Sequence, residues 1–170
     1  MNQRDTIFTE IVHSNHSSIY RICLAYLYDK SHAADLYQEI LLQIWKSLDS
    51  YKGAAMINTW VYRIAVNTAI TYNNQFSKDR YVELPDTVNI ADDNAAHSKE
   101  KETQLSALSY AISQLDTHDR LIISLVLEDL SYKEIAEITG SNTNNIGVRI
   151  TRIKTKLMKL INDKIDNDGL

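Results

Sequence analysis

Apolar side chains recur every three to four residues in two blocks of this sequence, and a polar stretch separates the blocks. In the first block, from Thr6 to Tyr72, three such runs follow one another. They contain Ile7, Ile11, Ile19, Ile22, Cys23, Tyr26 and Leu27, then Leu36, Ile40, Leu41, Ile44, Trp45 and Leu48, then Trp60, Ile64, Ala65, Thr68 and Tyr72. This spacing predicts three amphipathic helices packed as a small bundle. Ser31 or Asp35 is predicted to cap the second helix, and Gly53 interrupts the pattern before the third.

Helical spacing returns at Gln104. The residues that carry it are Leu105, Leu108, Ile112 and Leu115 in one helix and Leu121, Ile122, Leu125 and Val126 in the next. The stretch 73–101 lacks this period, is rich in acidic and amide residues, and contains the only proline, Pro85. We therefore expect a helical domain over residues 1–75, a flexible acidic linker over 76–103 and a second helical domain over 104–166.

Residues 131–157 predict two helices joined by a tight turn. Ser131 and Glu134 have the spacing of a capping box, and Gly140 suits the left-handed conformation that ends many helices. The second helix has Asn142 or Thr143 as its cap and Ile146, Ile150, Ile153 and Leu157 as its buried stripe. The pair predicts a helix-turn-helix, whose second helix enters the DNA major groove.

Polar side chains on that second helix are predicted to contact DNA. The candidates for the groove are Thr143, Asn144, Asn145, Val148 and Arg149, with Arg152, Lys154 and Lys156 placed for phosphates. A plain helical hairpin with a solvated basic face is the alternative explanation of the same spacing. Gly147 within the helix costs about 1 kcal/mol relative to alanine unless close approach to DNA requires it.

Composition and charge narrow the choice of class. One proline and four glycines in 170 residues favour an all-α fold. The net charge of −4 disfavours a polyanion as partner, but the charge is sorted: residues 141–165 contain six cations and one acid, whereas 86–102 is acidic. This concentration of cations favours DNA binding by the second helix pair.

Other classes of site find little support. Cys23 is the only cysteine, so neither an internal disulfide nor a cysteine-based zinc site is possible. His13 and His16 lie one helical turn apart without an evident third ligand, so no metal is expected. No apolar run is long enough for a signal peptide or a membrane span, and we expect the protein in the cytoplasm.

Two segments resemble conserved regions of bacterial sigma factors. Residues 35–72, "DLYQEILLQIWKSLDSYKGAAMINTWVYRIAVNTAITY", are similar to their second region, in which a D-L-x-Q-E helix is followed by a tryptophan, a glycine-containing loop and a T-W-x-Y-R-I-A-x-N helix. Residues 107–161 resemble their fourth region, including "SQLDTHDRLIISLVLEDLSYKEIAEITG". A chain with only these two regions resembles the extracytoplasmic-function (ECF, group IV) sigma factors of the sigma-70 superfamily.

This resemblance implies a transcription-initiation subunit without enzymatic activity or cofactor. Its partners would be core RNA polymerase, through the largest and second-largest subunits, promoter DNA and an anti-sigma factor. The first domain would bind polymerase through Asp35, Gln38, Glu39, Gln43 and Lys46, and the −10 element through Tyr51, Lys52, Asn58, Thr59, Trp60, Arg63 and Asn67. The second domain would read the −35 element. Of these residues, Tyr51, Lys52, Asn58 and Thr59 are expected near the surface, and Trp60 is either a wedge at melted DNA or, more commonly for a large aromatic, a core residue.

The sequence also departs from the family pattern. Val66 stands where an arginine is frequent, and "NNQF" after it lacks the usual cations, which predicts weak promoter grip by the first domain. Two other classes of protein therefore stay open. One is a stand-alone helix-turn-helix regulator that dimerises through its first bundle; the other is a degenerate sigma-like protein that binds polymerase or an inhibitor without opening promoters.

Overall fold

The computed structural model of the chain describes residues 3–27, 30–53, 56–76 and 99–167, and every regular element in these ranges is a helix. The α-helices are α1 (Gln3–Tyr26), α2 (Ala33–Ser47), α3 (Ile57–Phe76), α4 (Lys99–Ser113), α5 (Thr117–Leu127), α6 (Tyr132–Thr139) and α7 (Thr143–Asn167). Two short 3-10 helices, η1 (Lys30–His32) and η2 (Leu48–Ser50), flank α2. The predicted all-α class is confirmed. Within the described ranges, no helix combines the length and apolar composition of a membrane span.

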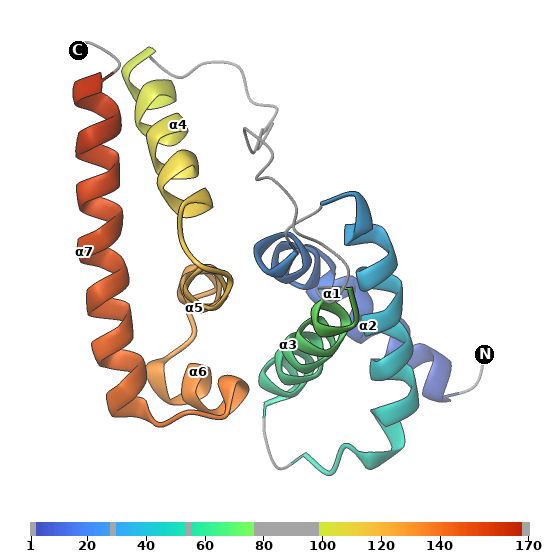
Figure 1. Cartoon of the computed structure of the whole chain (residues 1–170). Coiled ribbons are helices and arrows are strands. Elements are labelled where there is room, and N and C mark those ends of the chain that lie inside the picture. Colours follow the sequence, from blue (N-terminus) through green and yellow to red (C-terminus); the bar gives the residue numbers. More distant parts are fainter. Residues whose placement is uncertain (1–2, 28–29, 54–55, 77–98, 168–170) are drawn as a thin grey trace.

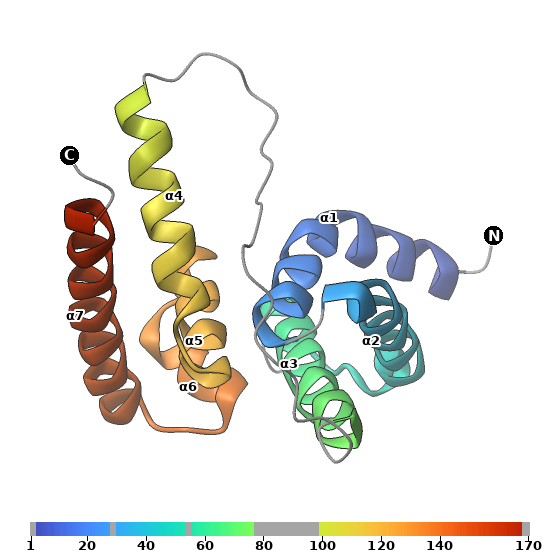
Figure 2. The same ribbon diagram turned by 45° about the horizontal axis from the view of Figure 1, so that its top comes forward.

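The helices form two groups that lie against each other. Helices α1, α2 and α3 pack together in one group, while α4 runs beside α7 in the other (Figure 1). Helices α5 and α6 lie between α7 and the first group, where α5 packs against α1 and α6 against α3 (Figures 1 and 2). Apart from Ala107, the buried apolar side chains of both groups belong to one continuous cluster.

The core of the first group follows the predicted stripes of α1 and α2, except at Ile7, which is 41% exposed. Ile19 and Ile22 of α1 and Ile40 and Ile44 of α2 are fully buried. The predicted stripe of α3 is wrong in most of its members: of Trp60, Ile64, Ala65, Thr68 and Tyr72 only Ala65 is buried, and the other buried apolar residues described in this helix are Val61, Tyr62, Val66 and Ala69.

Trp45 is only partly buried, because its ring lies at the edge of the bundle, with Arg4 stacked 4.5 Å from the ring centroid. Neither Ser31 nor Asp35 occupies the predicted cap position of α2: the N-cap is His32, whose side chain makes no capping hydrogen bond, and η1 leads directly into the helix.

The packing of α4 differs from the prediction. Leu105 and Leu108 were expected in a core but are exposed, whereas Ala107 and Ala111 are buried. Small residues on that face suit the close approach of α4 to α7. Leu115 is buried but follows the end of α4 at Ser113.

The helix-turn-helix forms through the predicted local signals. Ser131 and Glu134 make a reciprocal capping box at the start of α6, and Gly140 ends that helix with φ of 67°. Asn142 caps α7, because its side-chain oxygen accepts a hydrogen bond from the Asn145 backbone N–H at 2.8 Å. The stripe Ile146, Ile150, Ile153 and Leu157 is buried as predicted.

Most of the predicted linker lies outside the described residues. Helix α3 continues to Phe76 and α4 begins at Lys99, five residues before the expected return of helicity at Gln104. Residues 77–98, which include Pro85, are not described.

Candidate nucleic-acid interface

Helix α7 presents the predicted DNA-contact residues in three rows around the buried stripe. Asn144, Val148 and Arg152 recur at a spacing of four residues and lie opposite the stripe. On the flanks, Asn145, Arg149 and Lys156 occupy one side, while Thr143 and Lys154 occupy the other. All of these side chains are exposed except that of Arg149, which is half-buried. The predicted residues therefore share one continuous polar surface of α7, on the side opposite the buried stripe and on both of its flanks.

Arg149 is engaged by two carboxylates of α5 and its N-cap. Its Nε donates to Asp119 Oδ1 at 2.6 Å, and its guanidinium lies 3.6 Å from Asp116 Oδ1. Burial acts to raise the pKa of Asp116, but hydrogen bonds with Asp119 and the charge of Arg149 outweigh it, so the pKa lies below its ordinary value. Arg149 thus connects α7 to α5, and any other acceptor must compete with Asp119 for its guanidinium.

Helix α2 turns a mixed polar surface away from the bundle. Asp35, Gln38 and Lys46 are exposed, and Glu39 accepts a 2.7 Å hydrogen bond from Gln43 Nε2. Leu42 lies within this row and is 44% exposed, although the sequence-based set omitted it. Its exposure was predictable, because Leu42 lies four residues from both Gln38 and Lys46 and therefore on the same face of the helix. An exposed leucine ringed by polar groups is typical of a protein-binding surface.

The loop before α3 forms an aromatic corner. The rings of Tyr51 and Trp60 lie 5.1 Å apart, and Trp60 is partly buried against the core. Lys52 and Asn58 are exposed beside them. Two aromatic faces next to a cation and an amide are groups that can hold unstacked bases.

Thr59 does not lie at the surface, contrary to the prediction. It is 3% exposed, and its hydroxyl donates to Glu134 Oε1 of α6 at 3.4 Å. One turn later, Arg63 Nη2 donates to the Glu137 side chain at 3.0 Å and to the Glu137 carbonyl at 3.1 Å. Asn67, a further turn along, is exposed. Two of the predicted −10 residues thus contact the helix-turn-helix of the same chain.

Val66 is a fully buried member of the core cluster. It follows Thr59 and Arg63 at i, i+4 and i+7, so the three residues share one face of α3. Val66 therefore packs in the core, at a position where an arginine would place a charge.

A second polar contact between the two helix groups involves residues that the sequence reasoning missed. Glu128, at the end of α5, accepts hydrogen bonds from Ser18 Oγ at 2.6 Å and from Arg21 Nε at 2.5 Å. Burial acts to raise the pKa of Glu128, but these hydrogen bonds outweigh it and hold the pKa below its ordinary value. The partners lie 107 and 110 residues apart, so no local pattern could have identified them.

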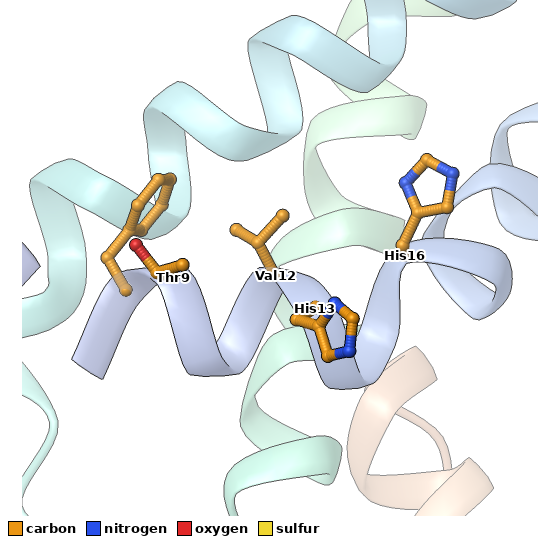
Figure 3. A pocket seen from close by; sticks show the side chains of 5 residues that line it. Thr9, Val12, His13 and His16 are labelled. Atoms are coloured by element: carbon orange, nitrogen blue, oxygen red, sulfur yellow. The ribbon is translucent and has the colours of Figure 1, made fainter. Parts of the chain in front are cut away.

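His13, His16 and Cys23 belong to α1. His13 and His16 project from α1 beside Thr9 and Val12 and line a hollow with Phe8 (Figure 3). His16 shares a 2.7 Å hydrogen bond with the Tyr37 hydroxyl. Among the described residues, no group of three potential ligands that could hold a metal ion occurs. Cys23 is fully buried, which raises the pKa of its thiol to about 12.

Comparison with known families matches both helix groups. The family described as Sigma-70 region 2 matches residues 11–75, and the family described as Sigma-70, region 4 matches residues 105–157. The RNA polymerase sigma factor SigV of Bacillus subtilis (strain 168) is 32% identical over 142 residues, which are 83% of this chain and 82% of that protein. The ECF RNA polymerase sigma factor SigW of the same organism is 27% identical over 167 residues, covering 92% and 89% of the two chains.

Solved structures share the fold at lower sequence identity. The sigma factor RpoE, in a co-crystal structure with the anti-sigma factor NepR from Bartonella quintana, superimposes with a TM-score of 0.74 at 20% identity. That match covers 91% of this chain and 96% of the other. CnrH, in complex with the cytosolic domain of CnrY, gives a TM-score of 0.66 at 20% identity, with coverage of 95% and 90%.

Proposed function

Because this chain belongs to the ECF group of the sigma-70 family of RNA polymerase sigma factors, we propose that it directs initiation at promoters that have separate −35 and −10 elements. The observation that carries this proposal is the presence of region 2 and region 4 matches in one chain, over residues 11–75 and 105–157. A lone helix-turn-helix would not distinguish a sigma factor from other regulators.

The −35 element is assigned to α7. Its Asn144, Val148 and Arg152 row would enter the major groove, while Lys154 and Lys156 on opposite flanks would contact phosphates on either side. To reach a base edge, Arg149 would give up its hydrogen bond to Asp119 and donate to the base instead. We expect Arg149→Ala to weaken binding to the −35 duplex by about 1–3 kcal/mol. Unchanged affinity in a fluorescence-anisotropy titration would refute that assignment.

The −10 element is assigned to the aromatic corner and α3. Tyr51, Trp60 and Lys52 would hold bases of the separated strand, and Arg63 and Asn67 would contact the edge of the duplex. The partly exposed rings of Tyr51 and Trp60 and the exposed amides of Asn58 and Asn67 support this assignment.

The exposed surface of α2 is assigned to core RNA polymerase. The set Asp35, Gln38, Glu39, Gln43 and Lys46, now with Leu42 at its centre, combines charged and apolar contact area on one helix. The relatives RpoE and CnrH were solved as complexes, the former with an anti-sigma factor. We extend this to the present chain and propose an anti-sigma factor as a further partner.

In vitro transcription tests the proposal. Purified protein, core RNA polymerase from a related bacterium and sheared genomic DNA are combined, and the new transcript starts are sequenced. We expect discrete starts that require the protein and share two upstream elements. As a control, Leu42→Asp should abolish both polymerase binding and the starts without changing the fold measured by circular dichroism.

Two other outcomes would favour the competing classes. Binding to polymerase without any dependent start would indicate a degenerate sigma-like interaction protein. Homodimers that bind palindromic DNA without polymerase would indicate a stand-alone regulator.

A further inference from the structure

Val148 is an apolar residue on the side of α7 that is assigned to the −35 element. It is 54% exposed and lies between Asn144 and Arg152, which precede and follow it by four residues. The buried stripe of the helix lies on the opposite side, and Val148 is not a member of the core cluster. Burial in the core therefore does not explain an apolar residue within this polar row.

Two exposed threonines, Thr151 and Thr155, lie on the same face as Val148, three and seven residues after it. The Thr151 hydroxyl donates a hydrogen bond to the Gly147 carbonyl at 3.0 Å, and the Thr155 hydroxyl donates to the Thr151 carbonyl at 3.0 Å. A hydroxyl has one proton to donate, and here each proton is used within the helix. What these threonines offer to another molecule for apolar contact is a methyl group.

The ring of Tyr132 borders this face of α7. A Cβ built at Gly147 would lie 3.7 Å from a Tyr132 ring carbon, and the ring is 41% exposed. Gly147 is adjacent to Val148 and one turn before Thr151, so the ring lies beside both side chains. We call Val148 and Thr151 the methyl patch: it is a narrow apolar surface within the polar side of α7.

We propose that the methyl patch selects thymine in the −35 element, with Val148 and Thr151 contacting the 5-methyl groups of two neighbouring base pairs. The inference rests on the proposed function and deepens it, because it states which base the middle of the groove-facing row recognises. Three residues of helix advance by about 4.5 Å, close to the spacing of about 3.4 Å between base pairs. Thr155 is excluded because it lies a further turn from the amino-terminal end of the helix, which contacts base edges.

The chemistry of the major groove favours thymine over the other bases at these positions. The 5-methyl group of thymine is an apolar group on that edge, whereas cytosine presents an amino donor and guanine presents two acceptors. A polar edge placed against Val148 would lose water without gaining a hydrogen bond, which weakens binding. The exposed cations Arg152 and Lys156 flank the patch, and they suit a nucleic acid better than the apolar centre of a protein interface.

Replacement of thymine by uracil tests the contact, because uracil lacks only the 5-methyl group and pairs with adenine in the same way. Fragments of a promoter mapped in the transcription experiment carry uracil at each thymine of the −35 element in turn, on either strand. Competition against a labelled promoter, followed by fluorescence anisotropy, gives the relative affinity of the complex of full-length protein and core RNA polymerase for each fragment. A fragment with uracil outside both promoter elements is the control DNA.

Three variants identify the side chains that contact the methyl groups. Val148→Ala removes two methyl groups from an exposed position. Thr151→Ser removes one methyl group and retains the hydroxyl that donates to Gly147. The matched control is Thr155→Ser, which makes the same change one turn later in α7. Circular dichroism checks that all three variants retain the helical fold.

For the wild type, we expect uracil at two neighbouring base pairs to weaken binding about two- to fivefold each, as expected for the loss of one methyl contact. Val148→Ala should bind thymine and uracil equally at one of these positions, and Thr151→Ser should do so at the other. Thr155→Ser should show both losses unchanged. The control DNA should bind every variant as the unsubstituted promoter does.

Wild-type affinity for every uracil-containing fragment would overturn the inference. Equal losses in the wild type, Val148→Ala and Thr151→Ser would also overturn it, as would a −35 element built of G·C pairs alone. If protein-dependent starts occur in these cases, the proposed function stands and only the selection of thymine is wrong. If no starts occur, the proposed function fails and the inference with it.

Discussion

Gly147 lies within α7, and its replacement by alanine separates a structural from a DNA-binding role for this position. An ideal Cβ built at Gly147 would meet only two ring carbons of Tyr132, at 3.7 and 3.8 Å, which is ordinary van der Waals contact. The backbone there is helical, without the positive φ found at Gly53 and Gly140. Since nothing in the structure opposes the methyl group, Gly147→Ala should stabilise α7 by about 1 kcal/mol.

The stability effect is measured by urea and thermal unfolding followed by far-ultraviolet circular dichroism. For a chain of this length, about 1 kcal/mol corresponds to a rise in Tm of about 2–4 °C. The matched control is Gly140→Ala, at φ of 67°, which forces a side chain into the left-handed region and should cost about 1–2 kcal/mol. An unchanged or lower Tm for Gly147→Ala would refute the reasoning from local geometry.

The same variant answers the functional question. If Gly147 is present because the helix backbone approaches DNA closely, the alanine variant will be more stable and yet bind the −35 duplex more weakly. If binding is unchanged, the glycine has no role in groove contact. A loss of affinity together with a loss of stability would support neither explanation.

Three further predictions concern single side chains. Ser131→Ala removes the cap of α6 and should cost about 1 kcal/mol, lowering Tm by about 2–4 °C; an unchanged Tm would show that the capping box contributes nothing. Cys23, fully buried with a pKa raised to about 12, should not react with Ellman's reagent at pH 8 until urea unfolds the protein, and rapid labelling of the native state would contradict this. The pKa of Glu128 in the folded protein lies below 4.5, so its stabilising contribution is complete above that pH and is lost as pH falls through the lower folded value. The Tm difference between wild type and Glu128→Gln should therefore shrink on acidification from pH 7 to pH 3, and a constant difference would disprove the linkage.

Several parts of the candidate site were predictable because their causes are local. The capping box of Ser131 and Glu134 spans three residues, and the turn at Gly140 depends on that residue's own φ. The row Asn144, Val148 and Arg152 follows from helical periodicity once Ile146 and Ile150 are recognised as buried. The exposed surface of α2 follows from the same periodicity. Leu42 was omitted from the predicted set because an apolar residue is ordinarily expected in the core.

The wrong predictions concern residues whose exposure depends on a neighbouring helix. Leu105 and Leu108 looked like core residues by their spacing, but α4 approaches α7 through alanines instead. Thr59 looked like a surface residue, yet α6 covers it from a position 75 residues later in the chain. Such contacts depend on which helices pack together, and the sequence of one helix does not specify which other helix will cover it.

The sequence by itself determined, in outline, the α-helices of the described residues, the helix-turn-helix and the family, because periodicity, capping and short motifs act within a few residues. Only the tertiary structure decided which exposed surfaces stay available. Arg149 is held by Asp119, Arg63 by Glu137 and Arg21 by Glu128, and each pair joins residues 30 or more positions apart. Folding alone brings these carboxylates to the three arginines, two of which, Arg149 and Arg63, are the ones that the proposed function assigns to DNA.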